Sequence, residues 1–162
     1  MKHFKLTAEK IVNAFGVNLF RIELTIDCKW GKAGDKGGFI EKEENISGDA
    51  WVYGNAWVYG NARVSGNARV YGDARVYGDA QVYGDAWVYG DAWEKSPLQI
   101  QGTRHFICMP KVGFLKIGCI ELSINDWGDR FKDIGNENGY TESEIKEYGL
   151  YIELAKTLNT QP

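Results

Sequence analysis

Residues 46–93 read ISGDAW VYGNAW VYGNAR VSGNAR VYGDAR VYGDAQ VYGDAW VYGDAW, a hexapeptide repeated without a break. Glycine recurs once in every hexapeptide from Gly48 to Gly90. A helix shows an apolar period of about 3.6 residues and a half-buried strand a period of two, so a period of six favours neither helices nor a meander of hairpins. It is typical of a parallel β-helix, in which short strands wind into stacked coils.

Each hexapeptide suits one side of such a coil. Its valine is β-branched and fits a buried column, and its alanine is small enough for a crowded corner. Glycine followed by Asn or Asp supplies the corner, because glycine adopts positive φ without steric cost and Asn or Asp hydrogen-bonds locally. Three hexapeptides close one coil, so each residue stacks on the one three repeats later in the chain. The predicted inner columns are Ile40, Val58, Val76; Ile46, Val64, Val82; and Val52, Val70, Val88.

Large side chains stack on the outside of the coil by the same spacing. Two outer columns alternate indoles with a guanidinium: Trp51, Arg69, Trp87 and Trp57, Arg75, Trp93. A guanidinium between two indoles contributes roughly 0.5–2 kcal/mol through cation–π attraction. In the third column Arg63 stacks on Gln81, without tryptophan.

Residues 40–94 resemble the hexapeptide-repeat proteins in this G-[DN]-A-x-V-Y pattern. The resemblance implies a left-handed parallel β-helix. Acyltransferases of that family use a histidine general base beside a pantetheine groove between subunits, whereas other members are structural or binding proteins. The expected fold is mainly β, with a left-handed parallel β-helix of about three coils between small α/β caps.

The segment before the repeats is expected to cap the coil, because an open β-helix exposes unpaired strand edges. Residues 7–15 (TAEKIVNAF) predict a short helix with Thr7 as N-cap, and residues 17–27 (VNLFRIELTID) predict a strand. A glycine-rich link at 31–38 leads into the first coil. The expected domains are 1–39, an N-terminal helix–strand cap; 40–94, the β-helix; and 95–162, a C-terminal α/β cap.

The segment after the repeats predicts the second cap. Alternating apolar residues in SPLQIQGTRHFICMP (96–110) and VGFLKIGCIEL (112–122) predict two or three strands. SINDWGDRFKDIG (123–135) predicts a helix. TESE at 141–144 is a capping box for a last helix. The apolar stripe of that helix is Ile145, Tyr148, Ile152 and Ala155.

The chain also resembles a group of short phage and prophage proteins that carry the same repeats. The resemblance rests on KLT-x-E-x-I near the start, RI at 21–22 and KAGDKGGFIEKEENIS at 32–47, and extends over essentially the whole chain. Proteins of that group are commonly labelled polymer-forming or acyltransferase-like. The resemblance implies an accessory protein of a mobile genetic element.

Composition limits the class of partner and the compartment. The 162 residues carry 19 Lys and Arg against 22 Asp and Glu, and the net charge of −3 disfavours binding to nucleic-acid polymers. No stretch of about 18 apolar residues exists, so no membrane span is expected. Cys28, Cys108 and Cys119 form no C-x-x-C pair, which argues against a disulfide framework and a cysteine zinc site. We expect a cytoplasmic protein, in the host during phage infection.

Candidate catalytic and metal-binding residues are few. His105 is the only plausible general base, because His3 lies near the terminus and the repeats contain no histidine. A single histidine in a capping sheet is more often a packed or surface residue. Outward Asp and Asn at the corners are explained by turn chemistry rather than by a metal. We expect no catalysis, cofactor or metal; an acyl-CoA-dependent acyltransferase with His105 as base is the alternative.

Outward aromatic residues favour binding. Tryptophans and tyrosines on the coil surface would leave more apolar area than a monomer usually exposes, and the related coils form trimers, which implies a homotrimer. Aromatic rings interleaved with arginine can stack a base and pair with a phosphate. Because the repeat block has three Arg against five Asp, a small nucleotide is favoured over a polymer.

The predicted ligand site draws on the repeats and on the segment after them. Gln99, Gln101 and Thr103 alternate along a strand and would project together beside Trp127, either lining a pocket or forming the wet side of a sheet. The full set is Arg69, Arg75, Trp87, Trp93, Gln99, Gln101, Thr103, Arg104, His105 and Trp127. The sequence thus predicts a non-catalytic phage protein that sequesters a small anionic ligand, with a host nucleotide immune signal as the candidate. A structural scaffold or a binder of a host protein is the further alternative.

Overall fold

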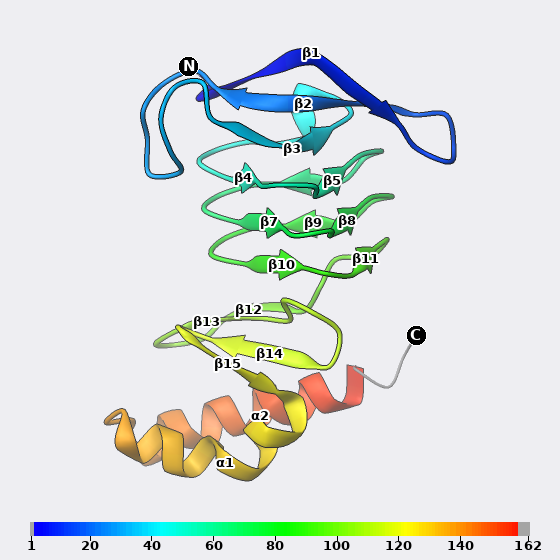
Figure 1. Cartoon of the computed structure of the whole chain (residues 1–162). Coiled ribbons are helices and arrows are strands. Elements are labelled where there is room, and N and C mark those ends of the chain that lie inside the picture. Colours follow the sequence, from blue (N-terminus) through cyan, green and yellow to red (C-terminus); the bar gives the residue numbers. More distant parts are fainter. Residues whose placement is uncertain (1, 159–162) are drawn as a thin grey trace. The chain divides into compact units, whose positions relative to one another are not determined.

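The computed structural model describes residues 2–158, which form two compact units with their boundary between Pro97 and Leu98. The first unit holds β1 (Phe4–Val12), β2 (Asn18–Leu24), β3 (Lys36–Ile40), the 3₁₀ helix η1 (Glu43–Asn45), β4 (Trp51–Val52), β5 (Trp57–Val58), β6 (Arg63–Val64), β7 (Arg69–Tyr71), β8 (Arg75–Val76), β9 (Gln81–Val82), β10 (Trp87–Tyr89) and β11 (Ala92–Trp93). The second unit holds β12 (Gln99–Gln101), β13 (Phe106–Cys108), β14 (Phe114–Ile117), β15 (Ile120–Ser123), α1 (Ile124–Glu137) and α2 (Glu142–Leu158) (Figure 1).

The short strands of the first unit stack as a β-solenoid of about three turns, as the period of six predicts (Figure 1). β4, β7 and β10 form one parallel side, β5 and β8 a second, and β6 and β9 a third. The three predicted inner columns are confirmed; the one that begins at Ile46 starts with a parallel bridge to Val64. Every member of these columns is buried, so the core of this unit is a prism of aliphatic side chains.

Glycine makes each corner of the solenoid. All repeat glycines from Gly48 to Gly90 have positive φ, between 55° and 76°. Some corners of successive coils also touch, since a Cβ placed on Gly66 would lie 3.0 Å from the amide nitrogen of Gly84. The corner at Gly66 therefore needs glycine both for its backbone conformation and for the closeness of the next coil, whereas the corner at Gly54 needs it for its backbone conformation alone.

The Asn or Asp that follows a corner glycine lies on the outside of the solenoid, and at two corners its side chain bonds to the equivalent side chain of the next coil. The carboxamide of Asn61 donates to the carboxylate of Asp79 at 3.0 Å, and that of Asn67 donates to Asp85 at 3.1 Å. The repeats change from Asn to Asp between these coils. An amide thus stacks on a carboxylate at these two corners, where two carboxylates would repel each other.

The N-terminal segment is a strand, so the predicted helix over 7–15 is wrong. β1 pairs antiparallel with β2, β2 pairs antiparallel with β3, and β3 joins β5 of the solenoid in parallel. The hydroxyl of Thr7 does accept a local bond, from the amide of Glu9 at 3.2 Å, but it lies where the register of β1 shifts. Pairing with the predicted strand over 17–27, which is confirmed as β2, outweighs the helix propensity of the segment.

Trp51 is covered rather than exposed, contrary to the prediction. Its indole is 2% exposed and lies against His3 and Phe4, with ring centroids 5.7 and 6.5 Å away. A Cβ on Gly37 would lie 2.7 Å from the indole, so the ring fits only because residue 37 is glycine. The indole thus closes the first coil beneath the N-terminal strands.

The last coil is one residue shorter than three hexapeptides, which overturns the predicted place of Trp93. Trp93 pairs with Val76 and Ala92 with Arg75, whereas an unbroken period would have paired Trp93 with Arg75. That unbroken period would have turned the carboxylate of Glu94 inward, at a large desolvation cost. The shift buries the indole of Trp93, 9% exposed, and leaves Glu94 in solvent.

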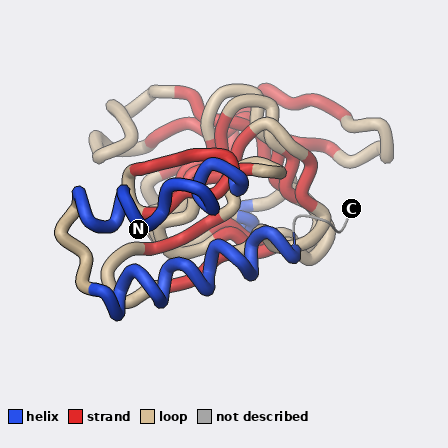
Figure 2. The backbone as a smooth tube through the Cα atoms, turned by 90° about the horizontal axis from the view of Figure 1, so that it is seen from below, coloured by secondary structure: helices blue, strands red, loops and turns tan. Residues whose placement is uncertain are grey.

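The second unit is a four-stranded antiparallel sheet in chain order with two helices, one strand more than the largest number predicted. Both predicted helices are confirmed, and they run side by side (Figure 2). The Ser123 hydroxyl accepts the Asp126 amide at the start of α1, and Thr141 and Glu144 form the predicted capping box of α2. Between residues 2 and 158, no helix has the length and apolarity needed to cross a membrane.

Alanine substitution at two corners tests the stacking. Gly54→Ala meets no atom within 4 Å and should lose only the cost of positive φ, about 1 kcal/mol. Gly66→Ala carries the same backbone cost and also presses on Gly84, so its loss should be about 3 kcal/mol. Denaturant unfolding of both variants measures the difference, and equal losses would contradict the stacked corners.

Candidate functional site

The guanidinium of Arg69 lies between two indole rings on the side of the solenoid that contains β7. Its Cζ is 4.5 Å from the ring centroid of Trp87 and 4.7 Å from that of Trp30. Trp87 is the predicted partner, whereas Trp30 takes the place predicted for Trp51. We call Trp30, Arg69 and Trp87 the arginine clamp.

Trp30 reaches the clamp from the loop between β2 and β3. A tight turn pairs the backbones of Cys28 and Gly31, and the Trp30 indole nitrogen donates to the carbonyl of Asp49 at 2.6 Å. The ammonium of Lys29 lies 4.6 Å from the centroid of the same ring. Sequence reasoning missed Trp30 because its loop lies outside the repeat. A tryptophan directly before the glycine-rich link at 31–38 could nevertheless have indicated a contact with the solenoid.

Arg69 has no carboxylate partner among residues 2–158, and its buried Nε has no hydrogen-bond partner there. Its Cζ contacts both indole rings, and its N–H groups are what it can offer to a further group. Planar N–H donors fit a carboxylate or phosphate in a bidentate pair. The clamp therefore holds a guanidinium that has no carboxylate partner among residues 2–158.

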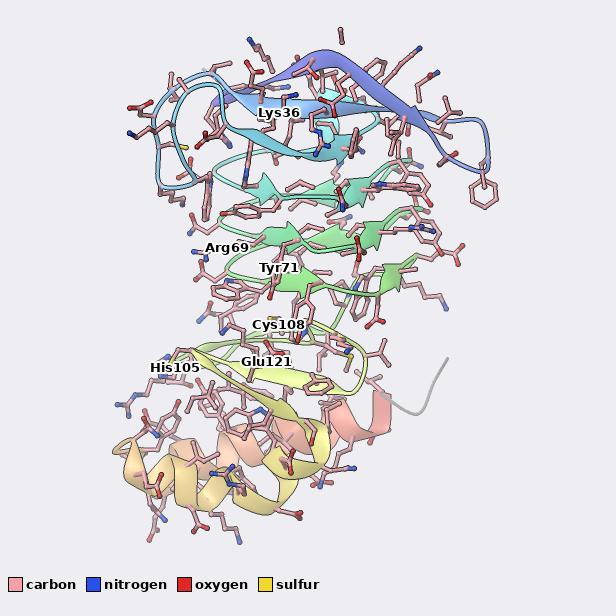
Figure 3. All side chains as sticks on the ribbon, in the orientation of Figure 1. Lys36, Arg69, Tyr71, His105, Cys108 and Glu121 are labelled. Carbon is pink, nitrogen blue, oxygen red and sulfur yellow. The ribbon has the colours of Figure 1, made fainter. Side chains whose placement is uncertain are left out.

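Tyrosines stand beside the clamp. Tyr71 meets Trp87 edge to face at 6.4 Å and stacks on Tyr89 at 5.0 Å, and Figure 3 shows Arg69 and Tyr71 on the solenoid. Burial raises the pKa of the Tyr53 hydroxyl, and the positive charge of Arg69 acts against that rise. Because its pKa lies above that of an ordinary tyrosine, Tyr53 is neutral at physiological pH and brings no negative charge to Arg69.

Arg75 forms a simpler contact than predicted. Its Cζ is 4.5 Å from the ring centroid of Trp57, but its backbone pairs with Ala92 rather than with Trp93. The second predicted sandwich therefore has one indole instead of two, as the shortened last coil requires.

Thr103 and Arg104, two predicted site residues of the second unit, connect the turn between β12 and β13 to α2 and to the residues that follow α1. The amide and hydroxyl of Thr103 donate to the carboxylate of Glu147 at 2.8 and 2.6 Å, and these bonds lower the pKa of that carboxyl. The guanidinium of Arg104 donates to the carbonyls of Gly139 at 3.0 Å and Asn138 at 3.3 Å. Both side chains have structural partners inside this unit.

Gln99 and Gln101 lie on β12, where they pair with Cys108 and Phe106 of β13. The Gln101 carboxamide donates to the carbonyl of Gly102 at 3.0 Å. Neither lines the pocket of this unit.

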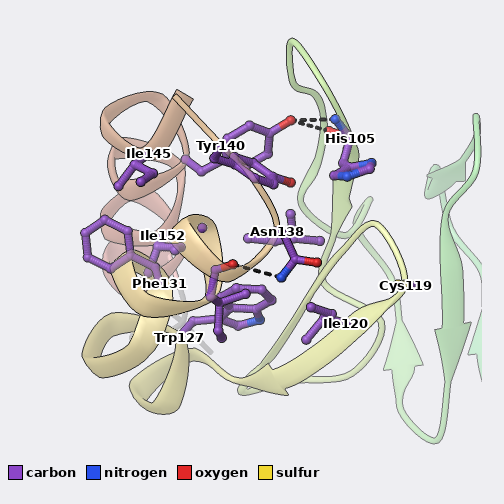
Figure 4. A pocket seen from close by; sticks show the side chains of 13 residues that line it. His105, Cys119, Ile120, Trp127, Phe131, Asn138, Tyr140, Ile145 and Ile152 are labelled. Carbon is purple, nitrogen blue, oxygen red and sulfur yellow. Dashed lines mark hydrogen bonds between the residues drawn. The ribbon is translucent and has the colours of Figure 1, made fainter. Parts of the chain in front are cut away.

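His105 and Trp127 do lie together, in a pocket between the sheet and the two helices (Figure 4). Its empty volume is about 490 Å³, part of it open to solvent. Trp127 is buried and donates its indole N–H to the carbonyl of Leu115 at 2.7 Å. Sequence reasoning named these two residues, but most of the apolar lining comes from α1 and α2, whose packing it did not predict.

The three cysteines are free, and no group of three or more metal-ligating side chains is found between residues 2 and 158.

Comparison with known proteins identifies the repeat. Residues 56–70, 62–78, 68–81 and 80–95 match the family model described as the YdcK beta solenoid repeat. The chain contains a hexapeptide-repeat β-solenoid. No curated protein matches the chain. The repeat of this β-solenoid protein accounts for the stacked coils, but Trp30 and the pocket both lie outside the matched residues.

Tyr148 of this solenoid protein tests how the second unit is held together. Its buried hydroxyl accepts the amides of Arg104 and His105 and donates to the carbonyl of His105 at 3.1 Å. Tyr148→Phe leaves the two amides without a partner, while the His105 carbonyl keeps its bond from the Gly102 amide, and should cost about 1–3 kcal/mol of unfolding free energy. Tyr151→Phe, which removes a surface bond to Glu147, is the control and should cost less than about 0.5 kcal/mol. Similar losses in the two variants, measured by denaturant unfolding, would contradict this role.

Proposed function

We propose that this β-solenoid protein is a non-catalytic binding protein that holds a small anionic ligand at the arginine clamp. One observation carries the proposal: the Arg69 guanidinium lies between two indoles with no carboxylate beside it among residues 2–158 and with a buried, unpaired Nε. By contrast, Arg21 pairs with Glu9 at 3.1 Å. The positive charge of Arg69 is held by contacts with two indoles and is not neutralised by a carboxylate, so it can pair with an anion from outside the protein.

The chemistry of the clamp favours a nucleotide within the class of anions. A phosphate can accept two N–H bonds from the guanidinium edge, and the indoles lower the local dielectric and strengthen that pair. A base cannot stack on the covered faces of Arg69, so it would use the aromatic side chains beside them, of which Tyr71 is the nearest in sequence. Phosphate recognition and ring stacking would thus be divided between neighbouring positions of one coil.

The proposed role is sequestration of a host nucleotide signal by a phage accessory protein in the host cytoplasm. The resemblance of the chain to phage proteins supports this setting, and sequestration needs affinity rather than catalytic groups. We further propose a homotrimer, because side chains such as Tyr83, 45% exposed, leave aromatic surface for self-association.

A host-protein binder is the second candidate, and one observation favours it. Phe15, at the tip of the hairpin between β1 and β2, is 82% exposed, and neighbouring Val12 is 60% exposed. An exposed aromatic tip of this kind is suited to insertion into a pocket of a partner protein.

Titration calorimetry with inorganic phosphate, linear nucleotides and cyclic dinucleotides tests the anion site. We expect saturable binding of at least one phosphate-bearing probe, and Arg69→Gln should weaken it by about 10–100-fold, the loss of one charge-assisted pair. Arg63→Gln is the matched control, because Arg63 occupies the same repeat position on β6 and is exposed. The proposal would be contradicted if no probe gave a heat of binding, or if Arg69→Gln and Arg63→Gln weakened binding equally. Turnover of acetyl-CoA that requires His105 would instead support the acyltransferase.

A further inference from the structure

The pocket of the second unit lies where the helices stand away from the sheet. Ile117 and Ile120 line it from the sheet, Trp127 and Ile134 from α1, and Ile152 from α2. The empty space between these side chains is about 490 Å³ and includes space that is open to solvent. The walls are thus largely apolar and come from β14, β15 and both helices.

Close helix contacts and polar bonds keep this hollow from collapsing. A Cβ on Gly135 would lie 2.8 Å from Ile145, so the helices already touch at that point. Hydrogen bonds from the turn at 102–105, between β12 and β13, to Glu147 and Tyr148 hold α2 against the sheet. The helices therefore cannot move closer to fill the space without breaking these bonds.

The polar atoms of Trp127 and Tyr148 in the lining are bonded to the backbone, and four further side chains with polar atoms complete it: those of His105, Cys119, Asn138 and Tyr140 (Figure 4). The rings of His105 and Tyr140 are 5.9 Å apart, and both His105 and Cys119 are exposed. Within residues 2–158 the His105 imidazole has no hydrogen-bond partner. It can therefore accept or donate a bond to a polar group of a ligand.

The charge of the lining limits the ligand. None of the lining residues is Lys, Arg, Asp or Glu. The nearby Arg104 donates to backbone carbonyls and lies 3.6 Å from Glu144, so its charge is already compensated. An ion placed in this pocket would lose its hydration without gaining a counter-ion. A neutral ligand is therefore favoured over an anion.

We propose that this pocket binds a small neutral aromatic molecule of the indole or phenol class. The flat ring packs against Trp127 and the isoleucines, and its N–H or O–H group bonds to a polar side chain such as His105. The site is separate from the arginine clamp, takes a ligand of different charge, and does not depend on the proposed function of the clamp.

Indole, with indole-3-carboxylate as its charged counterpart, is the probe. Titrated into the full chain at pH 8, indole should shift the methyl NMR signals of Ile134 and Ile152 saturably. Ile120→Trp, which fills the pocket, should abolish these shifts, whereas Leu154→Trp on the exposed face of α2 should not. Arg69→Gln should bind indole unchanged. No saturable shift, shifts that persist in Ile120→Trp, or equal binding of the carboxylate would overturn the proposal.

Cys119 supplies a second readout that needs no change in the pocket. In a Cys28→Ser background it is the exposed thiol, because Cys108 is buried. Indole at ten times its Kd should slow reaction of Cys119 with a thiol reagent by about tenfold. A rate unaffected by indole would count against the proposal even if Ile120→Trp failed to fold.

Discussion

The stacking of each coil on the next is the constraint on which the first unit depends. Backbone bonds such as Trp51 N–H to the Ala68 carbonyl, at 3.1 Å, and Arg69 N–H to the Ala86 carbonyl, at 2.8 Å, hold equivalent positions of successive coils in register. Each side chain inside the stack therefore has a fixed neighbour above and below. The outer residue choices follow from this arrangement: Asn lies over Asp at the corners, and a guanidinium lies beside an indole on the sides.

Where the repeat is regular, sequence reasoning succeeded. Corner glycines, buried valines and the parallel columns follow from a local rule applied many times, and no distant contact alters it. The helix starts at α1 and α2 were predictable for a similar reason, since the side chains that cap them and their backbone partners lie close together in the sequence. The same reasoning found the Arg69–Trp87 contact, because both residues obey the repeat.

Sequence reasoning failed where distant segments meet. Residues 7–15 have helical propensity but pair with β2, and the loop that carries Trp30 folds onto a later coil of the solenoid at Arg69. Trp93 departs from the period because the next residue is Glu94, whose charge cannot enter the core. The pocket was only partly foreseen, through His105 and Trp127, because its shape depends on how far the helices stand from the sheet. The clamp and the pocket thus both arise at places where the periodic rule no longer decides the structure.

Backbone NOEs in the solution NMR spectrum test the stacking most directly. The structure predicts contacts between strands that run in the same direction and are three hexapeptides apart, as between Val52 and Val70. At the last coil the spacing should become one residue shorter, with Val76 next to Trp93. Contacts of the antiparallel kind between successive hexapeptides would contradict the solenoid, and contacts that pair Trp93 with Arg75 would contradict the shortened last coil.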